Sequence, residues 1–244
     1  MSVLLVTGAS SGIGAAVAIA FAEAGWDVMA SGRDEGRLDE LAEAAENIVT
    51  WAGALESSEE CDELVADTLD EFGQIDCLVN SAGLLFRGDV TETDDDDWRE
   101  TFAVNLDIPF YLSRAALPHL QESAGTIVNI ACASALRAER RSVAYATAKA
   151  GLVMLTKAMA RDHAADGVRV NAVCPGPVDT PLLAAAADEA EEDVDGFLER
   201  LATASPNGRV ATPEDVAAVV RFLASAEAAH ITGAVVPVDG GLGA

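Results

Sequence analysis

The 244-residue sequence has very little positive charge. It contains 15 lysine and arginine residues against 41 aspartate and glutamate residues, which gives a formal net charge of −26. Only two of the basic residues are lysines, Lys149 and Lys157. A surface this acidic repels nucleic acid, so we expect no DNA or RNA partner. It also repels itself, and we therefore expect a halophilic protein, for which high salt screens the repulsion.

The sequence also lacks a cysteine framework and a targeting segment. Its four cysteines (Cys61, Cys77, Cys132 and Cys174) have neither metal-ligand spacing nor the density of a disulfide scaffold. We expect no metal site and a reduced, cytoplasmic location. The first 22 residues are uncharged, but they have no basic start, and the stretch Thr7–Gly12 interrupts the apolar run. We therefore expect neither a signal peptide nor a membrane anchor.

Half of the residues are hydrophobic, and apolar, β-branched runs alternate with Ala-rich segments of helical period. This alternation predicts an α/β fold with a parallel sheet that right-handed crossovers cover on both faces. No linker or repeat interrupts it, so we expect a single domain over residues 1–244. The predicted strands are Val3–Thr7, Asp27–Ala30, Ile48–Trp51, Cys77–Val79, Thr126–Ala131, Arg169–Val173 and Ala234–Val238, and the predicted helices include Ala15–Ala24, Glu59–Phe72 and Val143–Ala165.

Residues 182–205 have a different composition. They follow Pro175, Pro177 and Pro181, are rich in alanine and acidic residues, and contain no strand signal. We interpret this segment as a helical flap over a substrate site at the carboxyl edge of the sheet, where open α/β sheets bind ligands. The alternative is a pair of surface helices that only connects neighbouring elements.

A glycine-rich loop follows the first predicted strand and leads directly into a helix. Its spacing, G-x-x-x-G-x-G, permits a tight turn and a close approach of the backbone to a pyrophosphate. The N-terminus of the helix adds free amides and a positive dipole. We therefore predict a dinucleotide site formed by Gly8, Ser10, Ser11, Gly12, Ile13 and Gly14.

The end of the second predicted strand bears on the choice of dinucleotide. NAD sites place an acidic residue at this point, whereas an arginine suits the 2′-phosphate of NADP. Here the chain reads Ser31-Gly32-Arg33, so Arg33 favours NADP(H) over NAD(H). The alternative is a solvated arginine that pairs with Asp34 or Glu35.

Tyr145 and Lys149 lie four residues apart at the start of a predicted helix and therefore share one face. A nearby cation favours the phenolate, so we expect Lys149 to lower the pKa of Tyr145 from about 10. A tyrosine tuned in this way exchanges a proton with a carbonyl or an alcohol. This pair predicts the proton-transfer site of an oxidoreductase.

Together, these motifs resemble the short-chain dehydrogenase/reductase family over essentially the whole chain. Thr7–Gly14 looks like its cofactor loop, and Tyr145-x-x-x-Lys149 looks like its catalytic pair. The resemblance implies a proton relay through Asn105 and cofactor contacts along Asn80-Ser81-Ala82-Gly83 and Pro175–Thr180. The further cofactor-binding residues that it implies are Asn80, Ala82, Gly83, Tyr145, Lys149, Pro175, Gly176, Val178 and Thr180.

The resemblance also implies a seven-stranded Rossmann-type sheet, a homotetramer or homodimer, and hydride transfer between NADP(H) and a ketone or secondary alcohol. The similarity to 3-oxoacyl-carrier-protein reductases is general and does not fix the substrate. Where the family commonly has an aspartate that holds the adenine, this chain reads Gly53-Ala54-Leu55, so the backbone of Leu55 is our candidate for that contact.

The main departure from the family pattern is Cys132, which stands where the family has its catalytic serine. Ser134 lies two positions further on. Three hypotheses remain open: Ser134 takes the role through a shifted loop, Cys132 acts as a weaker hydrogen-bond donor, or the protein is a non-catalytic or regulatory relative that binds the dinucleotide.

Two charged segments remain to be placed. The segment Arg137–Arg141 contains three arginines before the catalytic tyrosine, and either steers an anionic substrate or forms ion pairs with the acidic surface. The acidic run Asp94–Asp97 predicts the start of a helix, where carboxylates complement the macrodipole.

Overall fold

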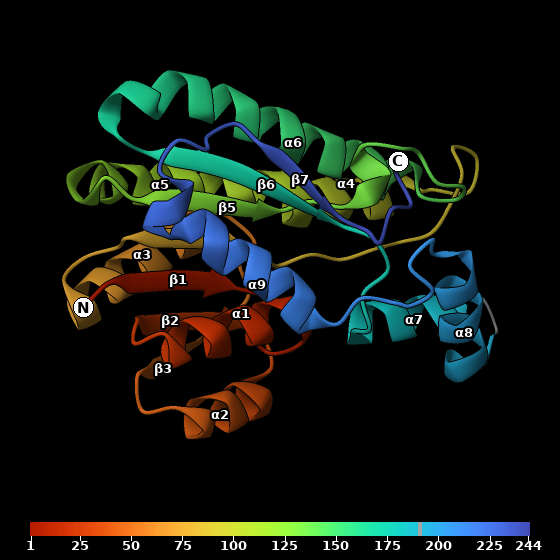
Figure 1. The fold of residues 1–244 in the computed structure, drawn as a ribbon, viewed down its shortest axis with the longest axis horizontal. Helices are drawn as coiled ribbons and strands as arrows, with labels where there is room; N and C mark the ends of the chain where they lie inside the picture. The colour runs from red at the N-terminus through yellow and green to blue at the C-terminus, as the bar shows by residue number, and fades with distance from the viewer. Residues whose placement is uncertain (190–191) are drawn as a thin grey trace.

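The computed structural model describes residues 1–189 and 192–244, which form a parallel sheet with helices on both of its faces (Figure 1). In this described part, seven strands are arranged in the order β3-β2-β1-β4-β5-β6-β7, and every neighbouring pair is parallel. This confirms the predicted Rossmann-type fold. The strands are β1 (Val3–Thr7), β2 (Asp27–Gly32), β3 (Ile48–Ala52), β4 (Cys77–Asn80), β5 (Thr126–Ile130), β6 (Arg169–Pro175) and β7 (Val235–Val238).

Helices connect successive strands and pack on the two faces. They are α1 (Gly12–Glu23), α2 (Glu35–Ala44), α3 (Ser58–Phe72), α4 (Asp95–Phe102), α5 (Ile108–Ser123), α6 (Val143–His163), α7 (Pro181–Glu189), α8 (Val194–Ala204) and α9 (Pro213–Ala224). A short π-helical segment, Ala103–Asp107, joins α4 to α5. Each helix in the described part of the chain is too short or too polar to cross a membrane.

The alternation of side chains along the strands divides the core into two layers. In β1, Leu4 and Val6 face the layer formed with α1, α2 and α9, whereas Leu5 faces the layer formed with α3 and α5. All three of these side chains are fully buried. Successive strand residues point to opposite faces of a sheet, so a strand covered on both faces is a continuous apolar run in the sequence.

Four strands extend further toward the carboxyl edge than the sequence predicts: β3 and β4 by one residue each, and β2 and β6 by two. β2 continues to Gly32, and β6 continues to Pro175, which pairs in register with Val238 of β7. The backbone N–H of Gly176 then donates to the carbonyl of Val238 at 3.0 Å. These extensions carry the chain to the edge where the sheet reverses its strand order between β1 and β4, the position at which such sheets bind ligands.

The predicted flap forms two helices, α7 and α8, at the end of the molecule toward which the strands point (Figure 1). Residues 190–191 of the predicted segment 182–205 lie outside the described residues. Phe197 of α8 is buried against Leu183 of α7, and Leu85 from the loop after β4 packs on the same cluster. The two helices therefore cover part of the carboxyl edge.

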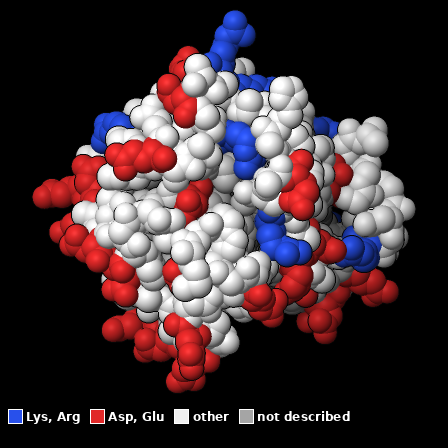
Figure 2. All heavy atoms as spheres, turned by 60° about the vertical axis from the view of Figure 1, so that its left-hand side comes forward, with Lys and Arg blue, Asp and Glu red and all other residues white. Residues whose placement is uncertain are grey.

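Acidic side chains are spread over the face of the molecule that Figure 2 shows, and the basic side chains there are fewer. The run Asp94–Asp97 starts α4 as predicted: the Asp94 side chain accepts hydrogen bonds from the backbone N–H groups of Asp96 and Asp97. Across residues 1–189 and 192–244, no group of three or more histidine, cysteine or acidic side chains is arranged to hold a metal ion.

Candidate active site

A cavity of about 600 Å³ opens at the carboxyl edge of the sheet. It extends from the glycine loop, past the start of α6, to the helices of the flap. Its lining includes most of the predicted site residues, namely Gly8, Ser10, Ser11, Gly12, Ile13, Gly14, Arg33, Leu55, Ala82, Gly83, Cys132, Ser134, Tyr145, Lys149, Pro175, Gly176, Val178 and Thr180.

The glycine loop fits a phosphate-binding role because side chains cannot be accommodated there. A Cβ atom at Gly14 would stand 2.3 Å from the carbonyl oxygen of Gly8, and a Cβ at Gly8 would stand 2.9 Å from the backbone of Ala82. Gly8 and Gly12 also have positive φ angles of 69° and 56°. The loop is thus a close-packed backbone cradle, with α1 starting at Gly12 and its first amides near the cavity.

Arg33 and Ser10 both line the cavity. Ser10 packs closely on the residue before Arg33, because a Cβ atom added at Gly32 would stand 3.0 Å from the Cβ of Ser10. The neighbouring Asp34 is engaged elsewhere: it accepts a hydrogen bond from the Arg37 backbone at 3.2 Å and pairs with the Arg37 guanidinium at 3.4 Å. Among the described residues, Asp34 therefore pairs with Arg37 and forms no ion pair with Arg33, which lines the cavity. This arrangement fits the phosphate of a dinucleotide better than the alternative of a surface pair with Asp34.

Tyr145 and Lys149 lie on the first two turns of α6, and both are buried. The Lys149 ammonium donates a 2.8 Å hydrogen bond to the carbonyl of Ile130 at the end of β5, and its Nζ lies 5.8 Å from the centre of the Tyr145 ring. The phenol of Tyr145 and the ammonium of Lys149 are therefore neighbours at the cavity wall, as predicted.

The predicted lowering of the Tyr145 pKa is wrong for this structure. Burial raises the pKa of Tyr145 well above 10, and the hydrogen-bonded Cys132 side chain adds to the rise. Burial also lowers the pKa of Lys149 to about 8. Desolvation disfavours the charged form of both groups, and it is the largest cause of each shift. At neutral pH the phenol is therefore protonated and the lysine is mostly an ammonium.

Cys132, just after the end of β5, occupies the position beside the phenol. Its side chain interacts with Tyr145, and its Sγ accepts a 3.4 Å hydrogen bond from the backbone N–H of Ser134. Ser134 lies in the short 3₁₀ turn Ala133–Ala135, and its buried hydroxyl has no hydrogen-bond partner among the described residues. Both residues line the cavity, and the thiol is the one whose interaction with Tyr145 raises the pKa of the phenol.

Asn105 sits in the π-helical segment between α4 and α5, a type of irregularity that is frequent at functional sites. Its amide nitrogen donates to the carbonyls of Leu84 and Thr101, both at 2.9 Å. Its buried Oδ1 has no partner in the described chain. A Cβ at Gly83 would lie 3.1 Å from this oxygen and 3.6 Å from Lys149 Nζ, so Gly83 keeps a small space open between them.

Two predicted residues do not line the cavity. Asn105 is the first, and Gly83, which does line the cavity, lies next to its Oδ1. Asn80 is buried at the end of β4, where its amide nitrogen donates to Asn129 Oδ1 at 2.8 Å and to Ser113 at 3.3 Å. The Asn80 side chain therefore joins β4 to its neighbours β5 and α5 and is not available to the cavity.

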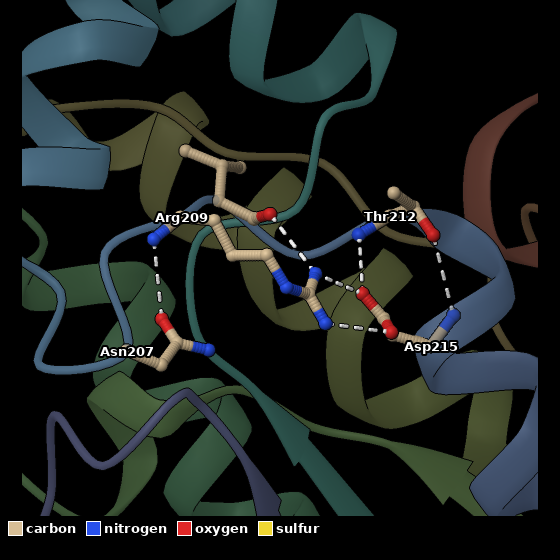
Figure 3. Close-up of polar contacts among 5 residues, drawn as sticks. Asn207, Arg209, Thr212 and Asp215 are labelled. Carbon is tan, nitrogen blue, oxygen red and sulfur yellow. Dashed lines mark hydrogen bonds and ion pairs between the residues drawn. The ribbon is translucent and has the colours of Figure 1, made fainter.

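The flap is fixed at both of its ends. The backbone of Pro177–Asp179, before α7, is hydrogen-bonded to Ala211, after α8, at 2.9 and 3.0 Å. Just beyond, Arg209 forms two hydrogen bonds with Asp215 at 2.5 and 2.9 Å, and Asp215 also caps α9 by accepting from the Thr212 backbone at 2.8 Å (Figure 3). Sequence reasoning missed this clamp.

The structure favours ion pairing over substrate steering for the segment Arg137–Arg141. Arg141 pairs with Glu92 at 2.7 Å, and Arg137 donates to the carbonyl of Leu242 at 3.0 Å. Of this segment, Glu139 is the residue that lines the cavity. A further arginine at the cavity wall is Arg87, in the loop after β4, which no sequence motif singles out.

Comparison with known proteins places the chain in a family. The family model described as "Enoyl-(Acyl carrier protein) reductase" matches residues 8–243. The chain belongs to the short-chain dehydrogenase/reductase family. It is an oxidoreductase and, like the dehydrogenases and reductases that it resembles, an NAD(P)-dependent enzyme.

The similarity extends over almost the full length of the relatives. The chain is 39% identical over 241 residues to a meso-2,3-butanediol dehydrogenase of Serratia marcescens, covering 98% of this chain and 93% of that protein. It is 34% identical over 245 residues to a 3-oxoacyl-[acyl-carrier-protein] reductase of Thermotoga maritima, covering 98% and 97%. A solved structure of an actinorhodin polyketide ketoreductase variant with NADPH superposes with a TM-score of 0.93 at 34% identity, covering 99% and 97%.

Proposed function

We propose that this enzyme uses NADP(H) to reduce a ketone to a secondary alcohol. The observation that carries the proposal is the buried pair Tyr145 and Lys149, placed with Cys132 at the wall of a cavity whose other end is the glycine loop and Arg33. The raised pKa of Tyr145 supports the direction of reduction, because a protonated phenol is a proton donor at neutral pH.

The residues of the chain have distinct parts in this reaction. A bound nicotinamide dinucleotide supplies the hydride that the carbonyl carbon receives. Tyr145 donates the proton to the carbonyl oxygen, so the C=O double bond becomes a C–H and an O–H bond. The Lys149 ammonium stabilises the phenolate that remains. The space between Lys149 Nζ and Asn105 Oδ1 suits a relay that returns a proton to Tyr145.

Residues around the two ends of the dinucleotide support NADP(H) as the cofactor. The backbone cradle of Gly8, Gly12 and Gly14 would hold the pyrophosphate. Arg33 and Ser10 would hold the 2′-phosphate, and the backbone at Leu55 would lie against the adenine. On the nicotinamide side, the segment Pro175–Thr180 would contact the carboxamide.

Consumption of NADPH with a panel of ketones, sugars and 3-oxoacyl thioesters tests the reaction. Tyr145→Phe removes the proton donor and should lower kcat by at least a hundredfold while NADPH still binds. Arg33→Ala should raise KM for NADPH more than tenfold and leave KM for NADH nearly unchanged. Equal effects on both cofactors would contradict the NADP(H) assignment, and full activity in Tyr145→Phe would contradict the reaction.

We further propose residues 1–244 as one catalytic domain with 182–205 as its substrate flap, and a homotetramer or homodimer as the assembly. The exposed Phe110 of α5 and Met154 of α6 support an oligomer, because large apolar side chains on a surface favour association. The free thiols support a reduced cytoplasm, and the acidic composition supports a salt-rich one. Light scattering at high salt measures the assembly directly.

A further inference from the structure

Arg87 lines the cavity near the start of the helix that carries Tyr145. It follows Gly83, Leu84 and Leu85 in the loop after β4. The next residue, Gly88, donates a hydrogen bond to the carbonyl of Arg141 at 3.0 Å and accepts one from the N–H of Val143 at 3.3 Å. Arg87 is therefore held beside the first turn of α6, at the end of the cavity that the substrate would occupy.

The guanidinium of Arg87 has a buried donor without an acceptor. Its Nε finds no hydrogen-bond partner among residues 1–189 and 192–244. Over the same residues, Arg87 forms no ion pair, whereas five other arginines pair with carboxylates, namely Arg37, Arg99, Arg141, Arg200 and Arg209. The other described side chains with a buried, unpartnered polar atom are neutral amides and hydroxyls. A buried donor without an acceptor is costly, so the protein alone does not satisfy this guanidinium. Its terminal nitrogens are not among the buried atoms without a partner, and they are the donors that a ligand in the cavity can reach.

The surroundings of Arg87 are apolar on the flap side. Leu85, two residues before it, packs against the same flap cluster as Leu183 and Leu201, which is centred on the buried Phe197. The same three flap residues line the cavity. A carbon chain placed against this surface would bring a terminal group to the guanidinium, and the low local dielectric would strengthen a charged hydrogen bond there.

Three acidic residues, Glu56, Glu100 and Glu139, also line the cavity and must be weighed against an anionic ligand. Glu56 follows Leu55 after β3, at the end of the cavity proposed for the adenine. Glu100 of α4 and Glu139 before α6 are both exposed, and within the described chain neither forms an ion pair with Arg87. Water and salt screen exposed carboxylates far more than they screen a buried N–H group. Glu100 and Glu139 therefore weaken the attraction of the cavity for anions without occupying the Arg87 donors.

We propose that Arg87 is a specificity-determining residue that binds the carboxylate of an oxo-acid substrate while Tyr145 meets its carbonyl oxygen. The planar guanidinium donates two parallel hydrogen bonds to a carboxylate, a geometry that a neutral ester or amide cannot match. This inference rests on the proposed reduction of a ketone, and it narrows the substrate class to carbonyl compounds that carry a carboxylate.

Binding measurements test the inference independently of turnover. The probes are 3-oxobutanoate, 4-oxopentanoate and 5-oxohexanoate, which vary the separation of carbonyl and carboxylate, together with the methyl ester of each. Calorimetry with the NADP⁺-loaded enzyme at one fixed KCl concentration should show at least one acid binding wild type on the order of ten to a hundred times more tightly than its ester. Arg87→Gln should abolish that preference, and Arg87→Lys should restore part of it.

The matched control is Arg140→Gln, which removes an exposed arginine that does not line the cavity and should leave the preference intact. Equal binding of acids and esters by wild type, or an unchanged preference in Arg87→Gln, would overturn the role of Arg87. Turnover separates this from the proposed function. If the esters are reduced with NADPH and the acids show no dependence on Arg87, the reaction stands and this inference fails. If the acid preference depends on Arg87 but no ketone is reduced, the role of Arg87 in binding stands and the proposed reaction fails.

Discussion

At the scale of single residues, the chemistry of the site depends on which side chain beside Tyr145 donates a hydrogen bond to the substrate oxygen. Cys132 stands at the position where the family has its catalytic serine. The structure places the thiol against the phenol, whereas the buried Ser134 hydroxyl has no partner in the described chain. This arrangement favours the hypothesis that Cys132 is the donor to the substrate oxygen. A thiol is a weaker donor than a hydroxyl, so this hypothesis predicts a weak contact at the developing oxyanion.

Substitution of Cys132 tests that assignment. Cys132→Ser should raise kcat for ketone reduction by about threefold to thirtyfold, because a hydroxyl donates a stronger hydrogen bond to the carbonyl oxygen. Ser134→Ala should change kcat by less than about threefold, and it serves as the matched control. Steady-state kinetics of both variants on one ketone substrate decide whether Cys132 or Ser134 is the donor. A large loss in Ser134→Ala with no gain in Cys132→Ser would assign the role to Ser134.

The pH dependence of the reaction follows from the two shifted groups. Tyr145 has a raised pKa and stays protonated across the neutral range, whereas Lys149 loses its charge above about pH 8. Ketone reduction should therefore be constant across the neutral range and decline above about pH 8, and alcohol oxidation should keep rising with pH because it needs the phenolate. Lys149→Arg should move the alkaline decline upward, whereas Lys157→Arg should not.

The buried lysine also has a cost for stability. Its pKa is lowered from 10.5 to about 8, so folding with a charged Lys149 costs about 3 kcal/mol at neutral pH. The cost is present below about pH 8 and disappears as the pH rises toward 10.5, where the unfolded chain also loses the proton. Lys149→Met should therefore raise Tm at neutral pH and raise it less near pH 10.5, while activity is lost. A Tm gain that is independent of pH would contradict this explanation.

At the scale of elements, a clamp joins the loop after α8, the last helix of the flap, to α9. Arg209 and Asp215 hold the loop that is hydrogen-bonded to Pro177–Asp179 (Figure 3). The ion pair lowers the pKa of Asp215 from 3.8 to about 2, so the pair persists above about pH 4 and is lost as the pH falls through about 2. The clamp therefore connects the flap to the body of the molecule throughout the neutral range.

Removal of the clamp should loosen the flap more than it destabilises the fold. Arg209→Ala should raise the substrate KM severalfold and speed amide hydrogen exchange in residues 192–212, with a loss of global stability of about 1 kcal/mol or less. The control is Arg99→Ala, which breaks exposed pairs of similar length with Asp95 and Asp96 on α4. Equal exchange rates in the two variants would show that the clamp does not hold the flap.

At the scale of the whole molecule, the net charge of −26 opposes folding unless salt screens it. At about 1 M salt the Debye length is roughly 3 Å, so repulsion between separate surface carboxylates is largely removed. Tm should therefore rise steeply from low to multimolar KCl. A variant with the exposed acids Asp39, Glu40 and Glu43 of α2 changed to Asn and Gln should need less KCl to reach the same Tm. A flat salt dependence in wild type would exclude a salt-adapted surface.

The sequence by itself determined the sheet, the glycine loop and the Tyr145–Lys149 pair. Period-two and period-3.6 patterns and backbone constraints on glycine are local, so they can be recognised without coordinates. The same local patterns predicted the start of α4 at the acidic run, but they missed the ends of β2 and β6, which lengthen because they pair with β3 and β7.

The tertiary structure decided what depends on burial and on partners distant in the sequence. Burial reversed the expected pKa shift of Tyr145, the interaction of Cys132 with the phenol favoured Cys132 over Ser134 as the hypothesis to test, and pairing with Glu92 engaged Arg141 outside the cavity. It also revealed Arg87, whose sequence signal is no more than one arginine in a base-poor chain. Desolvation and ion pairing are set by which side chains meet in space, and a linear pattern does not contain that information.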